Sequence, residues 1–207
     1  MIGIIDYGVG NINAFINILK QIGVPYKKVS NESELVNVQK LILPGVGHFD
    51  YAMKRFQDSG MIDKINKMVL QQNTPVLGVC VGMQMMANNS DEGILPGLGW
   101  INAEVKKFDS TQLIGNEPLP LPHMGWNDIT LEKFSPILTG LENNSHFYFL
   151  HSFYFVCHED SDRIASANYG SNFTCVANHK NVFGVQFHPE KSHNYGIKLL
   201  KNFSELC

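Results

Sequence analysis

The chain has 207 residues, 44% hydrophobic and 17% charged, which is the composition of a folded globular protein and excludes a disordered one. The formal net charge of −3 argues against the broad basic surface of a nucleic-acid-binding protein. The start, MIGIIDYG, lacks the basic and apolar segments of a secretory signal, and no apolar run approaches the roughly 18 residues that span a bilayer. We therefore expect a soluble cytoplasmic protein whose four cysteines are reduced thiols.

The first part of the chain alternates short apolar runs with longer amphipathic stretches. The apolar runs predict strands at residues 2–5, 40–43 and 75–79. The amphipathic stretches predict helices at residues 12–22, 49–56 and 61–71, and a further helix beginning over residues 83–87. Strands that alternate with helices in this way are typical of a parallel sheet with crossover helices.

The second part of the chain is dominated by short strands separated by turn residues. The predicted strands are residues 100–108, 126–131, 147–150, 153–157, 163–169, 173–178 and 182–187. A closing helix is predicted at residues 193–205. We expect residues 1–207 to form a single α/β domain, with a mainly parallel core and an antiparallel-rich layer.

Cys80 lies in the segment L-G-V-C-V-G-M-Q, where a buried strand meets a helix. This G-x-C-x-G pattern is that of a nucleophile elbow with Cys in place of Ser. Gly78 and Gly82 leave space for a tight turn, and the helix N-terminus beyond it favours the thiolate. The backbone N–H of Val81 is then placed to stabilise an oxyanion. The alternative is a buried structural cysteine in a glycine-flanked turn.

A thiolate nucleophile needs a base that also protonates the leaving group, and His188 is the best placed of eight histidines. It ends a predicted strand and is followed by Pro189 and Glu190. Because Pro189 keeps His188 extended, residues 188 and 190 point to the same side of the chain. The Glu190 carboxylate can therefore orient the imidazole, which predicts a Cys-His-Glu triad.

Two glycine-rich loops follow predicted strands. The loop P-G-V-G-H-F could supply a second oxyanion N–H from Val46 or Gly47, although an ordinary strand-to-helix turn has the same composition. The segment from Gly8 to Asn13 lacks the third glycine of a dinucleotide fingerprint, so we expect no nucleotide cofactor. The remaining histidines show no metal-ligand spacing, so we expect no metal either.

The blocks PGVGHF, GVCVGMQ and GVQFHPEKS resemble the class I, triad-type glutamine amidotransferases. More narrowly, IDYGVGNI, PHMGWN and FLHSF resemble the glutaminase subunits of imidazole glycerol phosphate synthases, over essentially the whole chain. The resemblance implies a flavodoxin-like three-layer α/β fold with a mainly parallel central sheet. It also implies that the enzyme hydrolyses L-glutamine to glutamate and ammonia.

The resemblance assigns residues around this chemistry. It implies Cys80, His188 and Glu190 as the catalytic triad, with oxyanion donors from Val81 and Val46. The substrate-binding residues that it implies are Gly47, Gln84, His151, Ser152 and Phe153. Val81 stands where Leu is commoner, and Phe153 where Tyr is common.

Ammonia that escapes into neutral water becomes ammonium, so an amidotransferase must pass it directly to a synthase. The resemblance implies that this synthase is a separate (β/α)8-barrel cyclase subunit, which makes imidazole glycerol phosphate and the purine-precursor carboxamide AICAR in histidine biosynthesis. The partner interface that it implies includes Asn11, Asn13, Trp126 and Asn127.

Three other functions remain open at the level of sequence. A paralogous subunit could supply ammonia for amidination of a surface-polysaccharide sugar, with the same chemistry at Cys80. A nucleotide-binding module would use the segment from Gly8 to Asn13. A cysteine protease would share the elbow geometry but would act on a peptide.

Overall fold

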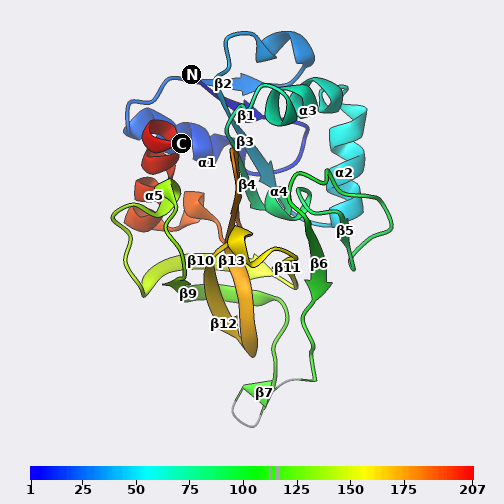
Figure 1. Cartoon of the computed structure of the whole chain (residues 1–207), viewed down its shortest axis with the longest axis vertical. Helices are drawn as coiled ribbons and strands as arrows, with labels where there is room; N and C mark the ends of the chain where they lie inside the picture. The colour runs from blue at the N-terminus through cyan, green and yellow to red at the C-terminus, as the bar shows by residue number, and fades with distance from the viewer. Residues whose placement is uncertain (112, 115–116) are drawn as a thin grey trace.

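Parallel strands form one part of a mixed sheet in the computed structural model, and helices flank them on both sides (Figure 1). The structure describes residues 1–111, 113–114 and 117–207. Each strand of this part pairs in parallel with its neighbour. In order across the sheet they are β2 (Tyr26–Val29), β1 (Ile2–Ile5), β3 (Lys40–Gly45), β4 (Val76–Cys80) and β14 (Val182–Val185).

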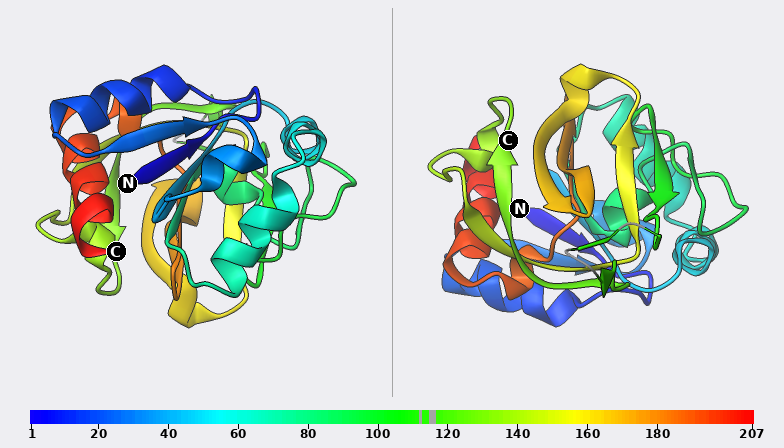
Figure 2. Two further views of the ribbon diagram at one scale, coloured as in Figure 1. Left: turned by 90° about the horizontal axis from the view of Figure 1, so that it is seen from above. Right: turned by 90° about the horizontal axis from the view of Figure 1, so that it is seen from below.

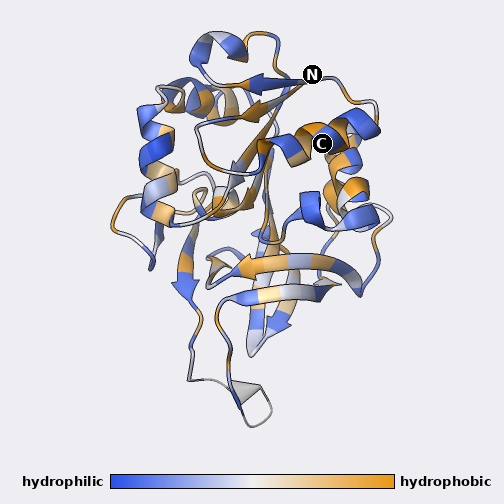
Figure 3. Cartoon of the chain, turned by 180° about the vertical axis from the view of Figure 1, so that it is seen from behind, coloured by the Kyte–Doolittle hydropathy of each residue, from blue (hydrophilic) through white to orange (hydrophobic). Residues whose placement is uncertain are grey.

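Two pairs of helices cover the parallel strands (Figures 1 and 2). On one side lie α1 (Ile12–Gln21) and α5 (His193–Leu206), and on the other lie α2 (Phe49–Asp58) and α3 (Ile62–Leu70). The helices mix hydrophobic and hydrophilic residues (Figure 3), because only one face of each packs on the sheet. Burying a Phe side chain such as Phe15 or Phe56 contributes about 1.5–3 kcal/mol. The predicted α/β three-layer fold is confirmed.

The remaining strands extend the sheet and make its antiparallel part. They are β13 (Ser171–His179), β12 (Arg163–Tyr169), β9 (His123–Leu131), β10 (Ser145–His151), β11 (Phe153–Cys157), β6 (Ala103–Lys107) and the short β5 (Asn89–Ser90), which pairs in parallel with β6. β7 (Leu113–Ile114) and β8 (Glu117–Pro118) pair antiparallel in a separate two-stranded sheet. β13 pairs antiparallel with β14, so the two parts of the sheet are continuous.

Most predicted elements are present with shifted ends, and those at residues 2–5, 153–157 and 163–169 have the predicted bounds. β2 was not predicted, because Lys27 and Lys28 interrupt its apolar pattern. It is an edge strand, and Lys28 forms an ion pair of 2.8 Å with Asp6. Within the described residues, no helix is long and apolar enough to cross a membrane.

Candidate active site

Cys80 lies at a sharp turn between β4 and the one-turn helix α4 (Val81–Gln84). Its backbone has φ 55° and ψ −114°, a region that costs a residue with a side chain about 1–3 kcal/mol. The residue is only 3% exposed, at the end of the parallel strands where ligands bind in open α/β sheets. This is the geometry of a nucleophile elbow.

Close packing explains the glycines on either side of the elbow. A Cβ atom on Gly78 would lie 2.6 Å from Cε of Met86 and 2.7 Å from the carbonyl oxygen of Gly82. A Cβ atom on Gly82 would lie 1.9 Å from the carbonyl oxygen of Leu43. Any side chain at position 82 would therefore push α4 away from β3.

The helix after the elbow is shorter and earlier than the sequence predicted. A helix beginning over residues 83–87 is wrong, because α4 starts at Val81 and ends at Gln84. Backbone carbonyls just beyond α4 accept hydrogen bonds from the following loop, as in the 2.7 Å bond from Leu98 N to Met85 O and the 3.1 Å bond from Ile101 N to Met86 O. These bonds end the helix, so Cys80 precedes a helix of a single turn.

His188 and Glu190 form a buried pair just after β14. Nδ1 of His188 lies 2.9 Å from Oε1 of Glu190, and the two side chains are only 3% and 2% exposed. The backbone at His188 is extended, with φ −100° and ψ 93°, as expected before Pro189. His188 N donates to the carbonyl of Tyr148 at 2.8 Å, and Ser192 Oγ donates to the carbonyl of His188 at 2.6 Å. Hydrogen bonds therefore hold both the N–H and the carbonyl of His188, which fixes the backbone that carries the imidazole.

Electrostatics favour a protonated His188. Burial lowers the pKa of the imidazole, but attraction to a charged Cys80 and the hydrogen bond to Glu190 outweigh it and raise the pKa to about 10. Oε2 of Glu190 is buried and has no hydrogen-bond partner within the described residues, so no other donor shares its charge. The arrangement suits a thiolate–imidazolium pair, which is both nucleophile and proton donor.

A pocket of about 120 Å³ opens beside Cys80, well below the roughly 300–1,000 Å³ of sites for drug-sized ligands. A small substrate is therefore favoured. All five residues predicted to bind substrate line it: Gly47, Gln84, His151, Ser152 and Phe153. Cys80, His188, Val81 and Val46 line it as well, so the structure gathers the elbow, the base and both predicted oxyanion residues around one space.

The pocket also contains residues that sequence reasoning missed. Glu92 and Lys191 bring opposite charges to its wall. Oε2 of Glu92 accepts a hydrogen bond of 2.8 Å from the N–H of Phe49, and burial raises the pKa of this carboxyl. Lys191 directly follows the H-P-E segment and was within reach of sequence reasoning. Glu92 carried no local signal, because a contact between distant segments places it there.

The two predicted oxyanion donors come from adjacent backbones. Val81 is the first residue of α4, whose N–H has no acceptor within the helix. The N–H groups of Val46 and Gly47 donate no hydrogen bond within the described part of the chain. A Cβ atom on Gly45 would lie 2.2 Å from the N atom of Gly82, so the loop and α4 pack backbone to backbone.

Two glutamines connect the pocket wall to the thiol. Nε2 of Gln84 donates to the carbonyl of Phe153 at 3.0 Å and to Oε1 of Gln186 at 3.1 Å. Nε2 of Gln186 lies 3.8 Å from Sγ of Cys80. Gln84, predicted as a substrate contact, therefore also ties the elbow to the start of β11.

The predicted partner residues differ in exposure. Asn11 and Asn13, at the start of α1, are exposed. Trp126 is 42% exposed and stacks between the rings of His146 and His193, at centroid distances of 5.6 and 5.2 Å. Asn127 is half-buried, because neighbouring residues of a strand face opposite sides. Its amide nitrogen donates to the carbonyl of Asn168 at 2.8 Å.

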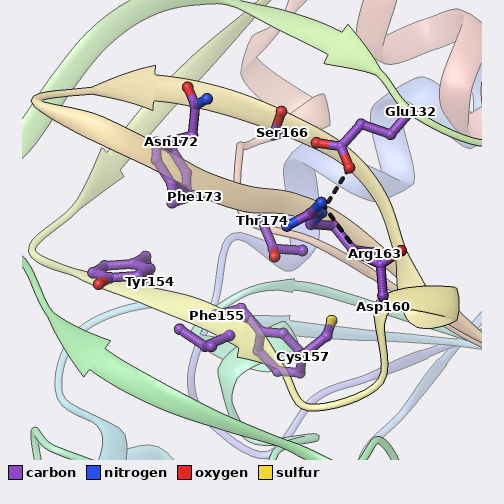
Figure 4. A pocket seen from close by; sticks show the side chains of 11 residues that line it. Glu132, Tyr154, Phe155, Cys157, Asp160, Arg163, Ser166, Asn172, Phe173 and Thr174 are labelled. Atoms are coloured by element: carbon purple, nitrogen blue, oxygen red, sulfur yellow. Dashed lines mark hydrogen bonds and ion pairs between the residues drawn. The ribbon is translucent and has the colours of Figure 1, made fainter.

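A second hollow, of about 330 Å³, lies against β11, β12 and β13 and shares no lining residue with the pocket at Cys80 (Figure 4). Its basic side chain, Arg163, is already bonded to Glu132 at 2.6 Å and to Asp160 at 3.2 Å. Arg163 is therefore already neutralised by carboxylates, and this hollow does not favour an anionic ligand. Within the described residues, no three His, Cys, Asp or Glu side chains gather as metal ligands.

The other cysteines are free thiols without a catalytic setting. Burial raises the pKa of Cys157 to about 12 and that of Cys207 to about 11. Burial also raises the pKa of Cys175, which is fully enclosed. These thiols stay protonated at neutral pH, which leaves Cys80 as the candidate nucleophile.

Comparison with known proteins gives the same family as the site. Residues 3–206 match the model of the family described as glutamine amidotransferase class-I. The chain is 52% identical to the imidazole glycerol phosphate synthase subunit HisH of Bdellovibrio bacteriovorus and 51% identical to that of Leptospira interrogans, each over 100% of both chains. The fold is similar to PurLQS from Thermotoga maritima, with a TM-score of 0.74 and 18% identity over 98% of this chain and 96% of the other. The chain belongs to the class I glutamine amidotransferases and, within them, to the HisH subunits of imidazole glycerol phosphate synthase.

Proposed function

We propose that Cys80, His188 and Glu190 hydrolyse the side-chain amide of L-glutamine. The Cys80 thiolate attacks the amide carbon, and the carbonyl electrons move onto oxygen. As this intermediate collapses, the His188 imidazolium gives its proton to the departing nitrogen, so ammonia leaves and a glutamyl thioester remains. Neutral His188 then takes a proton from water, which attacks the thioester and releases glutamate and the thiolate. The observation that carries this proposal is the buried His188–Glu190 pair beside the strained Cys80 elbow.

The backbone around the elbow supports an oxyanion site. The N–H groups of Val81 and of Val46 would donate to the negative oxygen of both tetrahedral intermediates. Removing one such donor typically costs about 3–4 kcal/mol of transition-state stabilisation, so this contribution is comparable to that of the base.

The lining of the pocket supports an amino acid as substrate. The Glu92 carboxylate offers a partner for the α-ammonium group, which a simple amide lacks. Gly47, Gln84 and the segment of His151, Ser152 and Phe153 would enclose the rest of the glutamine. The absence of a hydroxyl at Phe153 removes one polar contact from this wall.

The ammonia is delivered to a cyclase subunit with a (β/α)8 barrel, in a heterodimer that makes imidazole glycerol phosphate and AICAR for histidine biosynthesis in the cytoplasm. The names of the HisH relatives support this acceptor and give none to the alternative, a polysaccharide sugar. The cyclase would contact the exposed residues Asn11, Asn13 and Trp126. Asn127 is half-buried and would contribute a smaller part of this interface. Residues 1–207 act as one domain.

Glutamate release tests the two parts of this proposal separately. Cys80→Ala should abolish release, while Cys207→Ala, which removes a thiol elsewhere, should leave it unchanged. Release that survives Cys80→Ala would contradict the triad. Adding the cyclase subunit should stimulate the wild-type chain, and no stimulation would contradict the assigned partner while leaving the triad intact.

A further inference from the structure

Two buried histidines outside the triad meet behind the wall of the pocket. His123 on β9 and His151 on β10 are paired directly across the antiparallel ladder. Nδ1 of His123 lies 3.1 Å from Nε2 of His151. The residues are 3% and 6% exposed, and the His123 ring stacks between Phe149 and Tyr169 at centroid distances of 4.8 and 4.0 Å. His151 lines the pocket and His123 does not.

Both imidazoles are neutral at physiological pH. Burial lowers the pKa of His123 to about 4. Burial, and then the neighbouring His123, lowers the pKa of His151 to about 3. A neutral imidazole has one N–H donor and one bare nitrogen acceptor, so each ring can take only one of two proton arrangements.

The surrounding acceptors select one arrangement. Nδ1 of His151 lies 2.8 Å from the carbonyl of Phe153, which can only accept, so His151 carries its proton on Nδ1. Its Nε2 is then an acceptor, and His123 must supply the proton from its own Nδ1. Nε2 of His123 in turn accepts from the amide of Asn127 at 3.3 Å. Donors and acceptors therefore alternate without conflict from Asn127 to Phe153.

The last acceptor of this series of hydrogen bonds, the carbonyl of Phe153, belongs to a residue that lines the pocket. The Phe153 carbonyl accepts from both His151 and Gln84, whose amide also holds Gln186 beside the sulfur of Cys80. Losing the His151 bond would leave the Gln84 amide as the remaining side-chain donor to the Phe153 carbonyl. This segment joins β10 to β11 and provides one wall of the pocket.

We infer that His123 is a positioning residue for the glutaminase reaction: its Nδ1–H donates to Nε2 of His151 and, together with the Phe153 carbonyl at Nδ1, fixes the His151 ring and the substrate-facing wall at residues 151–153. The inference rests on the proposed function for the identity of the substrate. It extends the site to a residue that touches neither substrate nor the triad.

Two variants separate the hydrogen bond from the packing. His123→Phe keeps an aromatic ring between Phe149 and Tyr169 but removes the donor. His123→Asn loses the stacking but places an amide nitrogen close to the former Nδ1. Ile129→Ala, on the same strand and fully buried, is the matched control for loss of stability alone.

Covalent labelling of Cys80 by a glutamine-analogue diazoketone measures binding and chemistry separately. For His123→Phe, the concentration for half-maximal labelling rate should rise about tenfold, while the limiting rate stays within about twofold. His123→Asn should recover most of the binding, and Ile129→Ala should lower Tm without changing that concentration. Unchanged binding in His123→Phe, or equal weakening in Ile129→Ala, would overturn the inference.

Nitrogen-15 NMR of the histidine rings gives a readout that needs no turnover. His151 should carry its proton on Nδ1 in the wild type and in both variants, because the Phe153 carbonyl accepts it. The chemical shift of its Nε2 should lose the signature of an accepted hydrogen bond in His123→Phe and keep it in His123→Asn. A wild-type His151 protonated on Nε2 would overturn the inference even if labelling behaved as expected. A chain that the diazoketone does not label would instead count against the proposed function, because the ring protonation is measured independently.

Discussion

Replacing Glu190 by Gln keeps the size of the side chain but removes the charge that faces His188. The pair is buried, with side chains 3% and 2% exposed, so water does not screen the interaction. Glu190 raises the pKa of His188, which stands at about 10 in the intact site. In Glu190→Gln we therefore expect a less basic imidazole, and with it a smaller fraction of the thiolate–imidazolium pair.

The size of the effect follows from the hydrogen bond of 2.9 Å between Nδ1 and Oε1. A hydrogen bond to a charged group contributes about 1.5–3 kcal/mol, and each 1.36 kcal/mol is a factor of ten in rate. The kcat for glutamate release should fall roughly 10- to 150-fold. KM should change less, because Glu190 does not line the pocket.

Steady-state glutamate release and the pH dependence of Cys80 alkylation by iodoacetamide check this expectation. The alkylation profile of Glu190→Gln should shift, since the imidazolium loses its proton at lower pH. Glu205→Gln is the matched control, because the Glu205 side chain is 54% exposed and its carboxylate forms a long ion pair of 4.0 Å with Lys201. The same change of charge there takes place in water, far from His188 in the sequence. A kcat within twofold of the wild type, together with an unshifted profile, would refute the role of Glu190.

Three further changes test the site and its supports. Gly82→Ala should destabilise the fold by about 3 kcal/mol in urea unfolding, because its Cβ would lie 1.9 Å from the carbonyl of Leu43; a wild-type midpoint would contradict this. Cys80→Gly should be about 1 kcal/mol more stable than Cys80→Ala, because φ at this position is 55° and glycine adopts it without strain; equal stabilities would show that the elbow is unstrained. The wild type should lose stability as pH falls from 6.5 toward 4, because buried His123 and His151 have lowered pKa values and the unfolded chain binds the protons. In His123→Phe the loss of unfolding free energy over this window should be smaller, by an amount on the order of 2 kcal/mol, and an identical loss would exclude a buried neutral His123.

The sequence predicted the parts of the site that neighbouring residues determine. The elbow at Cys80 depends on glycines two positions away on each side, and the turn at His188 depends on the proline that follows it. In both cases neighbouring residues in the sequence determine the backbone conformation. The alternation of strands and helices in the first part of the chain followed for the same reason, since the apolar period of each segment indicates its type. β2, whose apolar pattern two lysines interrupt, is the exception.

Features that depend on contacts between distant segments could not be predicted. α4 ends at Gln84 because the loop around residue 98 takes the next carbonyls, and no residue inside the helix indicates that end. Glu92 reaches the pocket through its bond to the N–H of Phe49, 43 positions away. The pairing of His123 with His151 needs the register of β9 against β10, which a single sequence does not specify.

The geometry of the site is held mainly by backbone contacts, in which glycine has two separate purposes. At Gly45 and Gly82 the backbones of β3 and α4 approach so closely that any Cβ atom would overlap, at 2.2 and 1.9 Å. This contact sets the separation between the Val81 N–H and the loop that carries Val46. At Gly47 a Cβ atom would meet no other atom within 4 Å, yet φ is +82°, so glycine is needed there for conformation alone. Substitutions at 45 or 82 should therefore lower the free energy of unfolding, whereas Gly47→Ala should leave the sheet intact and impair only the pocket.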